Sequence, residues 1–273
     1  MPGTLFVVAT PIGNLEDLTL RAARILCEAP VVAAEDTRHT RKLLSHLDAH
    51  PRLLSYNQHN AASRTPELLA ALAEGQDVAL VSDAGVPAVS DPGAALVAVA
   101  AAAGVRTVPV PGPSALTALL SIAGFSADSF HFLGFLPRQG RAREALLARY
   151  GADPLPLVCF EAPHRLRAAL EALAGALGPE RAVCVGRELT KLHEEFYRGT
   201  LAGALGHFSA PRGEFALAVE GAPPAAPEPV SEGALDALLA RLKAQGLSRR
   251  DGASEAARAL GVPKREAYAR WPV

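Results

Sequence analysis

Short apolar runs alternate with helical patterns through the first 125 residues, and this rhythm constrains the fold more than any other feature of the sequence. A short apolar run bounded by turn residues is typical of a buried strand, and helical spacing follows most of these runs. Strand and helix in this order favour a parallel sheet with helices on its faces, which is an α/β fold. Strands are expected at 4–9, 31–34, 77–81 and 105–110, and helices at 18–28, around 41–44, from 65 to 75, and at 94–103.

The alternation of strand and helix patterns becomes less regular after residue 124, and the remaining length is sufficient for a second domain. The chain has 273 residues, 49% of them apolar and 20% charged, with a net charge of −1, which excludes a disordered or fibrous protein. Such a length fits one large or two medium domains. We predict an N-terminal domain at 1–124 and a second α/β domain at 125–220. In the second, strands are expected at 130–135, 157–160, 183–187 and 215–219, and helices at 141–150 and 165–177.

A Pro-rich stretch and a basic tail follow the second domain. Four prolines in the nine residues 221–229 cannot sustain a helix or a sheet, so 221–230 is predicted to be a stiff linker. Residues 241–273 carry eight basic and three acidic side chains, a net charge of +5, whereas the other 240 residues carry −6. Such a tail is typical of contact with a polyanion, although a solvated helical face has the same charge pattern.

The tail itself has the pattern of a small basic helical domain at 231–273. Leucines at helical spacing predict a helix at 235–242. Ser248 is expected to cap a helix that ends at Gly261, and Pro263 to open a last helix. Two short helices around a Gly-containing turn favour a helix-turn-helix, with a helical hairpin packed on the body as the alternative.

The cysteines and the first residues indicate the cellular compartment of the protein. Cys27, Cys159 and Cys184 are widely spaced and form no CxxC pair, so neither a disulfide framework nor a zinc site is expected. The start of the chain lacks the basic and apolar regions of a signal peptide. The longest stretch without charge, 107–127, is broken by prolines and predicts a strand, a turn and a helix instead of a membrane span. We predict a cytoplasmic protein with no membrane partner.

Familiar catalytic signatures are missing from the sequence. It has no GxxxxGK[ST], no GxSxG, no HExxH and no GxGxxG after the first strand, which argues against kinases, α/β hydrolases, zincins and ordinary dinucleotide enzymes. Polar loops rich in Gly and Pro follow four predicted strands instead, and the ligands of an α/β sheet bind at such carboxyl ends. Each loop taken alone is typical of a turn or a helix cap. The loops span 10–14, 35–39, 82–93 and 111–115.

These loops read TPIGN, EDTRH, SDAGVPAVSDPG and PGPSA, and GFLP, FEAPHR, RELTKLHEE and GEF follow in the second domain. In this order and spacing, the segments resemble the tetrapyrrole-methylase superfamily, and within it the branch of 16S rRNA (cytidine-2′-O)-methyltransferases. The resemblance covers residues 3 to about 224, and the tail from 247 onward is similar to the helix-turn-helix of those enzymes. One departure is Val86, where Thr is more common, which puts a hydroxyl contact near the cofactor in doubt.

The resemblance implies two αβα domains with S-adenosylmethionine in the cleft between them, a homodimer, and 16S rRNA or the small ribosomal subunit as partner. The implied reaction is 2′-O-methylation of a cytidine ribose in the decoding region. Gly and Ala in the loops suit this cofactor, because they let the backbone approach it closely. No metal is expected. The residues implied to contact the cofactor are Pro11, Gly13, Ala84, Gly85, Val86, Ser114, Ala115, Phe160, Glu161, Leu189, Thr190 and Gly213.

The implied reaction directs the search for a catalytic base. Methyl transfer to a hydroxyl is an in-line displacement, so positioning supplies much of the acceleration, and a carboxylate or imidazole in reach can take the proton. Asp36, Asp91, Glu35 and His39 are the candidates, and Arg38 is placed to hold a phosphate. The alternatives stay open: both aspartates as helix caps, Glu35 and Arg38 as an internal ion pair, and His39 as a solvent-facing residue.

Two other functions are open to such a chain. A methylase that acts on a small tetrapyrrole precursor would share the loops, but it has no need of a basic helical tail. A non-catalytic nucleic-acid-binding protein would use the tail, but it has no need of cofactor loops. The two features together favour an enzyme that methylates RNA.

Overall fold

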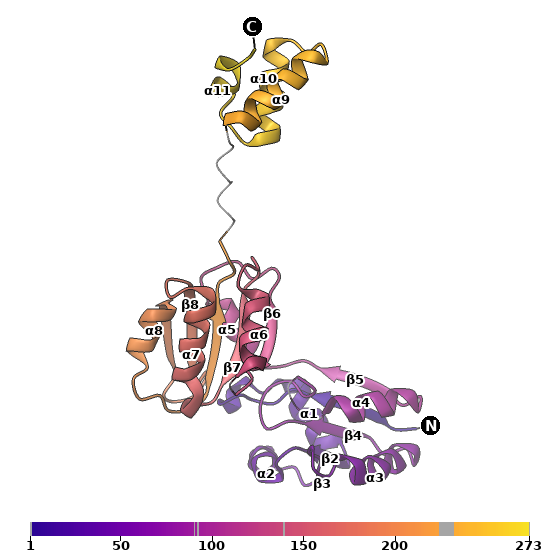
Figure 1. Ribbon diagram of the computed structural model, residues 1–273. Helices are drawn as coiled ribbons and strands as arrows, with labels where there is room; N and C mark the ends of the chain where they lie inside the picture. Colours follow the sequence, from indigo (N-terminus) through magenta and orange to yellow (C-terminus); the bar gives the residue numbers. More distant parts are fainter. Residues whose placement is uncertain (1, 90, 92, 139, 224–231, 273) are drawn as a thin grey trace. The chain divides into compact units, whose positions relative to one another are not determined.

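The computed structural model describes residues 2–89, 91, 93–138, 140–223 and 232–272 (Figure 1). Internal contacts divide the chain into two compact units, Met1–Ala222 and Pro223–Val273. Ser90 and Pro92 of the predicted 82–93 loop lie outside the described residues, and so do residues 224–230 of the predicted linker. The boundary at residue 124, inside the first unit, stays a prediction.

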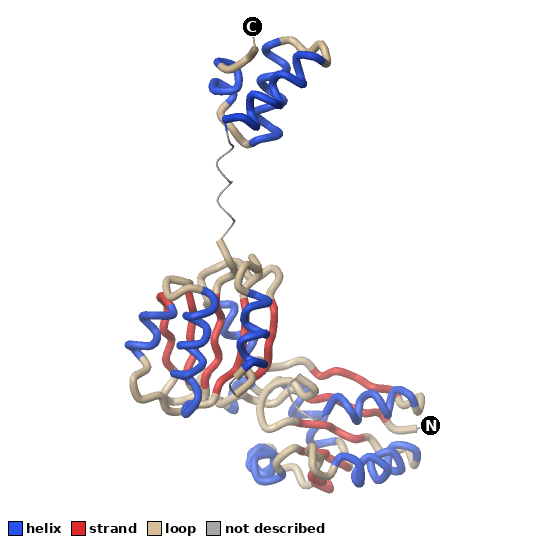
Figure 2. Tube along the Cα trace, viewed as in Figure 1, coloured by secondary structure: helices blue, strands red, loops and turns tan. Residues whose placement is uncertain are grey.

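A five-stranded parallel sheet with helices on both faces forms the first part of the first unit (Figure 2). Its elements are β1 (Thr4–Val8), η1 (Leu15–Asp17), α1 (Leu20–Glu28), β2 (Val31–Ala34), α2 (Thr37–His46), β3 (Arg52–Ser55), α3 (Ala61–Ala73), β4 (Val78–Val81), α4 (Gly93–Ala102) and β5 (Arg106–Val110). The strand order is β3-β2-β4-β1-β5. Val78 and Leu80 pack with α3 and α4, while Ala79 and Val81 pack with α1 and α2, which explains why these strands are apolar throughout.

Helix α3 begins one turn earlier than predicted, so the expected start at Thr65 is wrong. A turn from Asn57 to Asn60 leads directly into the helix, and the Ala61 amide already donates to the Asn57 carbonyl at 2.9 Å. The Thr65 hydroxyl donates to the Ala61 carbonyl at 2.8 Å instead of capping a terminus. Pro66 therefore lies inside the helix, where it lacks the amide that would complete one helical hydrogen bond.

A mixed five-stranded sheet forms the second part of the same unit, in the order β6-β7-β10-β8-β9. Its strands are β6 (His131–Phe135), β7 (Leu157–Glu161), β8 (Ala182–Arg187), β9 (Glu195–Thr200) and β10 (Phe215–Val219). β6 and β7 run parallel, and the other neighbours run antiparallel. One face packs on α6 (Arg141–Tyr150), α7 (Pro163–Leu177) and α8 (Leu201–His207). β9 and α8 were not predicted.

Helix α5 (Ala115–Ser121) covers the other face of this second sheet. That face carries small residues, including Ala216, Ala218 and Gly186, which let the helix approach closely. A Cβ on Gly186 would lie 2.6 Å from Cδ2 of Leu189 and 3.0 Å from Cδ1 of Leu119. The segment after β5 thus leaves the first sheet and becomes part of the packing of the second. The predicted α/β fold with αβα layers is confirmed.

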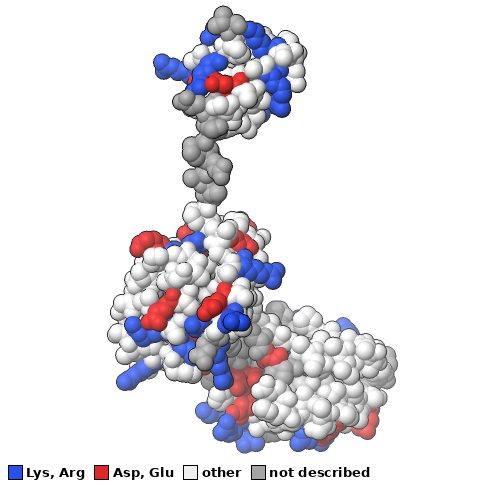
Figure 3. All heavy atoms as spheres, in the orientation of Figure 1, with Lys and Arg blue, Asp and Glu red and all other residues white. Residues whose placement is uncertain are grey.

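The second unit is a bundle of α9 (Glu232–Ala244), α10 (Arg249–Leu260) and α11 (Lys264–Ala269), with Leu239 and Ala256 in its core. The predicted cap is present: the Asp251 amide donates to the Ser248 hydroxyl at 3.2 Å. Gly261 ends α10 with a left-handed φ of 66°. In the space-filling view, Lys and Arg side chains outnumber acidic ones on the visible face of this unit (Figure 3). Across the described residues, no helix is both long enough and apolar enough to span a membrane.

Candidate functional site

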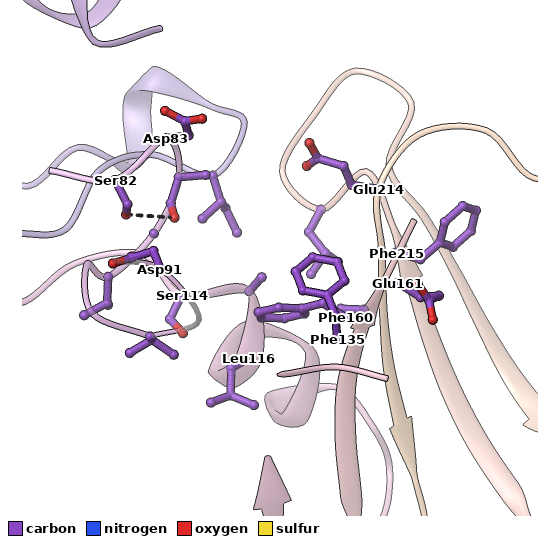
Figure 4. A pocket seen from close by; sticks show the side chains of 18 of the residues that line it. Ser82, Asp83, Asp91, Ser114, Leu116, Phe135, Phe160, Glu161, Glu214 and Phe215 are labelled. Carbon is purple, nitrogen blue, oxygen red and sulfur yellow. Dashed lines mark hydrogen bonds between the residues drawn. The ribbon is translucent and has the colours of Figure 1, made fainter. Parts of the chain in front are cut away.

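A cavity of about 450 Å³ lies in the first unit, at the carboxyl ends of the first sheet (Figure 4). Loops after β2, β4 and β5 form one side, and residues of the second sheet and its loops form the other. Asp83 and Asp91 lie on the first side, and Phe135, Phe160 and Glu214 on the second. A volume of this size suits a cofactor-sized ligand.

Hydrogen bonds from backbone amides to backbone carbonyls and to one carboxylate join the loops of the first side. The Thr10 amide donates to the Gly85 carbonyl at 2.9 Å, and the Gly85 amide donates to the Thr10 carbonyl at 3.0 Å. Gly85 has a φ of +78°, a left-handed conformation that other residues adopt with strain. The Asp36 amide also donates to Oδ1 of Asp83 at 2.9 Å. The loops after β1, β2 and β4 are therefore held in one arrangement.

Glu35 follows β2 and is a partly buried carboxylate in the cavity wall. Burial raises the pKa of Glu35 most, and the negative charges of Asp83 and Asp91 raise it further. A hydrogen bond from the Asp83 amide lowers it in part. Glu35 is thus a more basic carboxylate than an ordinary glutamate, which is the property a proton acceptor needs.

Asp36 and Arg38, two of the predicted catalytic residues, do not line this cavity. Oδ1 of Asp36 accepts from the Arg38 amide at 2.8 Å and so caps α2. Nη2 of Arg38 lies 2.6 Å from Oδ2 of Asp36, and these hydrogen bonds hold the pKa of Asp36 well below its usual range. Arg38 therefore pairs with Asp36 and not with Glu35. The geometry favours capping over base catalysis for Asp36.

Asp91 lines the cavity and also organises the loop before α4. Its Oδ1 accepts from the Ala88 amide at 2.7 Å and from the Gly93 amide at 2.8 Å. A Cβ on Gly93 would lie 2.9 Å from this same oxygen, so glycine is needed for the close approach. Asp91 thus combines the capping role left open by the sequence with a place in the cavity wall.

A smaller cavity of about 170 Å³ lies next to the main one and shares Ser82 and Asp83 with it. Pro11, Gly13 and His39 line this smaller cavity and not the main one. The predicted cofactor residues Pro11 and Gly13 thus do not line the cavity that holds most of their set. His39 is exposed on α2, in agreement with the solvent-facing alternative.

The loop after β8 packs against the loop after β1. A Cβ on Gly13 would lie 2.3 Å from Cγ of Lys191 and 2.9 Å from Oγ1 of Thr190. Thr190 has a φ of +68°, and its Oγ1 is buried with no hydrogen-bond partner among the described residues. Nζ of Lys191 lies 2.8 Å from Oε2 of Glu214 and so anchors a residue of the cavity wall. Thr190 and Gly213 line neither cavity; Thr190 lies against Gly13, and Gly213 lies against Glu188.

Glu161 is a buried carboxylate on the aromatic side of the cavity. It is 2% exposed, its Oε1 accepts from the Ala162 amide at 2.9 Å, and Nε of Arg165 lies 3.2 Å away. Burial raises the pKa of Glu161, while the Ala162 amide and the Arg165 charge lower it. Arg165 also donates to the Leu136 carbonyl. This link joins β7 to the loop after β6.

Some of the predicted site residues line the main cavity, and other residues that line it were not predicted. Two of the residues missed, Phe135 and Ala162, stand inside the GFLP and FEAPHR segments, which could have pointed to them. The predicted residues that line the main cavity are Glu35, Ala84, Gly85, Val86, Asp91, Ser114, Ala115, Phe160, Glu161 and Leu189. Those not predicted are Ile12, Ser82, Asp83, Val89, Leu116, Phe135, Ala162, Pro163, Glu214, Phe215 and Ala216.

The chemistry of the wall suits a positively charged ligand with an aromatic part. Glu35, Asp83 and Asp91 supply negative charge, and Phe160 supplies an apolar ring on the other side. Small residues such as Ala84 and Ala115 leave room for close backbone contact. Within the described part of the chain, no group of three or more His, Cys, Asp or Glu residues could hold a metal ion. S-adenosylmethionine carries a sulfonium, an amino group and an adenine. These groups fit a wall that has carboxylates on one side and an aromatic ring on the other.

Comparison with known proteins gives the family. Residues 4–204 match the model of the Tetrapyrrole (Corrin/Porphyrin) Methylases. A Ribosomal RNA small subunit methyltransferase I from Synechocystis sp. is 46% identical over 268 residues, which cover 97% of this chain and 96% of that protein. One from Thermotoga maritima is 44% identical over 221 residues, which cover 80% of this chain and 99% of that protein. The crystal structure of uroporphyrin-III-C-methyltransferase from Thermus thermophilus matches with a TM-score of 0.58 and 25% identity, over 80% of this chain and 94% of that one.

These matches confirm the superfamily that the motifs predicted and S-adenosylmethionine as the methyl donor. The predicted loops that line the cavity lie mostly within the matched residues 4–204. The chain is a methyltransferase and belongs to the family of tetrapyrrole (corrin/porphyrin) methylases.

Proposed function

We propose that the chain transfers the methyl group of S-adenosylmethionine to the ribose 2′-oxygen of a cytidine in 16S rRNA. The observation that carries this proposal is the place of Glu35, a partly buried carboxylate in the wall of the cavity, where it can accept the proton of a hydroxyl. Burial also raises the pKa of Glu35. The relatives named for small-subunit ribosomal RNA match nearly the full chain, which supports the RNA part. A cytoplasmic homodimer that acts on 16S rRNA or the small ribosomal subunit completes the proposal.

The cofactor would be held from both sides of the cavity. S-adenosylmethionine supplies a methyl group on a positively charged sulfur. Ala84, Gly85 and Ala115 offer backbone groups at close range, and Phe160 offers a ring for the adenine. Asp83 and Asp91 place negative charge in the wall and favour a cationic ligand. Positioning of the ribose oxygen in line with the methyl group then supplies much of the rate.

Glu35 is the base that the geometry favours. The ribose hydroxyl is a very weak acid, so its proton must pass to an acceptor during or after the attack. Glu35 lines the cavity and has a raised pKa, whereas Asp36 is turned to α2 and has a lowered one. Asp91 is the second candidate, but its Oδ1 already accepts two backbone hydrogen bonds.

The basic tail favours RNA over a tetrapyrrole precursor. It lies in a compact unit of its own, Pro223–Val273, in which residues 241–273 carry a net charge of +5 and the whole unit carries +2. A polyanionic substrate explains that charge, because each bound phosphate releases counterions and adds affinity. A small tetrapyrrole needs no such unit. The cavity and its motif-bearing loops, in turn, argue against a purely binding protein.

Labelled methyl transfer tests the proposal. Purified protein, labelled S-adenosylmethionine and either small ribosomal subunits or naked 16S rRNA are combined, and the RNA is digested with alkali. We expect label in a dinucleotide that survives alkali, since a methylated 2′-oxygen can no longer attack its phosphate. A target with a 2′-deoxycytidine should take no label. Label on a base, or transfer only to a tetrapyrrole, would contradict the ribose assignment.

A further inference from the structure

A bulge in β6 turns Phe135 toward the cavity. Phe132 pairs with Val158 and Phe135 pairs with Phe160, so three residue steps on β6 oppose two on β7. Gly134 has a φ of 60° at this irregularity. In a regular strand, Phe132 and Phe135 would point to opposite faces. The extra residue puts both on the face of Phe160, and bulges next to active sites commonly redirect a side chain in this way.

The redirected ring is exposed, although it is large and apolar. Phe135 is 53% exposed and lines the main cavity. Its ring meets Phe160 in an edge-to-face contact with the centroids 6.0 Å apart. Figure 4 shows the two rings side by side on the cavity wall. The fold therefore holds an aromatic ring at the cavity in a place where core packing does not require it.

Arginines follow this ring directly in the sequence. Arg138, Arg141 and Arg143 come within eight residues of Phe135, with no acidic residue between them. Arg138 and Arg141 are exposed, and no ion pair is found for either within the described residues. Arg143 donates to the Arg138 carbonyl at 3.2 Å and is close enough to Glu161 to lower its pKa. Arg143 thus lies by the aromatic side of the cavity, and Arg141 begins the same helix, α6, two residues before it.

We propose that Phe135 stacks on an unpaired base of the RNA substrate and that Arg141 binds a neighbouring phosphate. This inference rests on the proposed function and names how its substrate is held. Proteins recognise single-stranded RNA by stacking bases on aromatic rings while cations follow the backbone. A ribose that enters the cavity brings its base to the rim, because the nucleotide must leave its stack to be reached. Phe135 and Arg141 supply the two contacts that such a nucleotide needs.

Binding of short RNA chains to the full-length protein tests the two contacts separately. The probes are hexacytidylate and a hexamer of the same ribose-phosphate backbone without bases, each measured by fluorescence anisotropy. Phe135→Ala should weaken hexacytidylate binding by about 10-fold or more and leave the abasic chain unaffected. Phe135→Trp should bind hexacytidylate about as well as the wild type. Phe135→Leu, whose side chain is apolar but not aromatic, should bind it as weakly as Phe135→Ala. Arg141→Ala should weaken both probes alike.

Each outcome decides for or against the inference. Unchanged hexacytidylate affinity in Phe135→Ala, full rescue by Leu, or no binding of hexacytidylate by the wild type would overturn it. Weaker binding of S-adenosylmethionine in Phe135→Ala, measured by calorimetry, would overturn it as well, because the ring would then belong to the cofactor. If the wild type puts no label into rRNA but hexacytidylate binding still depends on Phe135, the proposed function fails and the stacking contact stands.

Discussion

The two sides of the cavity differ in chemistry. The side built on the first sheet carries the carboxylates Glu35, Asp83 and Asp91. The side built on the second sheet carries the rings Phe135 and Phe160, and its carboxylates Glu161 and Glu214 are paired with Arg165 and Lys191. The first sheet is parallel, so all its carboxyl ends, with their polar loops, meet at one edge. The second sheet is mixed, and strand residues themselves form its wall. We infer that the first side handles charge and the proton, and the second side handles flat rings.

Removal of the carboxylate from the first side should have the largest effect. Glu35→Gln keeps the shape of the side chain but cannot accept the proton, so we expect kcat to fall by about 10²- to 10⁴-fold. Affinity for the cofactor and for RNA should change little, as checked by calorimetry and anisotropy. Asp36→Asn is the matched control, because Asp36 lies outside the cavity and should retain most activity. A nearly normal kcat for Glu35→Gln would contradict the assignment of proton transfer to the first side of the cavity.

Removal of residues 224–273 should leave both sides of the cavity intact and weaken only RNA capture. We expect unchanged binding of S-adenosylmethionine and RNA affinity lower by at least about tenfold. The slope of log K against log salt should become shallower by about 0.7 for each single-strand phosphate that the shortened protein no longer neutralises. An unchanged salt slope would assign the tail arginines to a solvated face.

Two glycine substitutions distinguish a loss of stability caused by backbone strain from a loss of cofactor binding at the cavity. Gly85→Ala and Gly104→Ala both place a side chain at a left-handed φ, +78° and +72°, without a severe clash. Each should therefore lower the free energy of unfolding by about 1–2 kcal/mol, seen as a lower Tm in calorimetry. Only Gly85→Ala should also weaken S-adenosylmethionine binding, because Gly85 joins the loops after β1 and β4. Equal loss of cofactor affinity in both variants would contradict the role of this link.

The first sheet and its polar loops could be predicted because they depend on local sequence. Apolar runs bounded by Gly and Pro predict buried parallel strands, and Glu35 was found as the residue that follows such a run. The edge strands β3 and β9 were missed because neither holds a run of more than two apolar residues: β3 reads RLLS and β9 reads EFYRGT. The start of α3 was missed because Thr65 and Pro66 mimic a helix start.

The aromatic side could not be predicted in the same way. Alternation along β6 places Phe132 and Phe135 on opposite faces, and only the pairing of β6 with β7 reveals the bulge. The place of Asp36 was also ambiguous, since an aspartate before a helix can cap it or serve a site. The choice depends on Arg38, whose side chain turns back to Asp36 in the folded chain. Both features arise from interactions that the local pattern does not contain.

The pH dependence of methyl transfer tests the central claim most directly, namely that Glu35 takes the proton from the substrate. The base acts only when ionised, so kcat/KM should fall about tenfold for each pH unit below its pKa. Because burial and the charges of Asp83 and Asp91 raise the pKa of Glu35, the decline should begin above the ordinary value of 4.5. We expect Asp36→Asn to keep this decline and Glu35→Gln to lose it together with most of the rate. A decline that persists in Glu35→Gln, or one that begins at or below 4.5, would contradict the account.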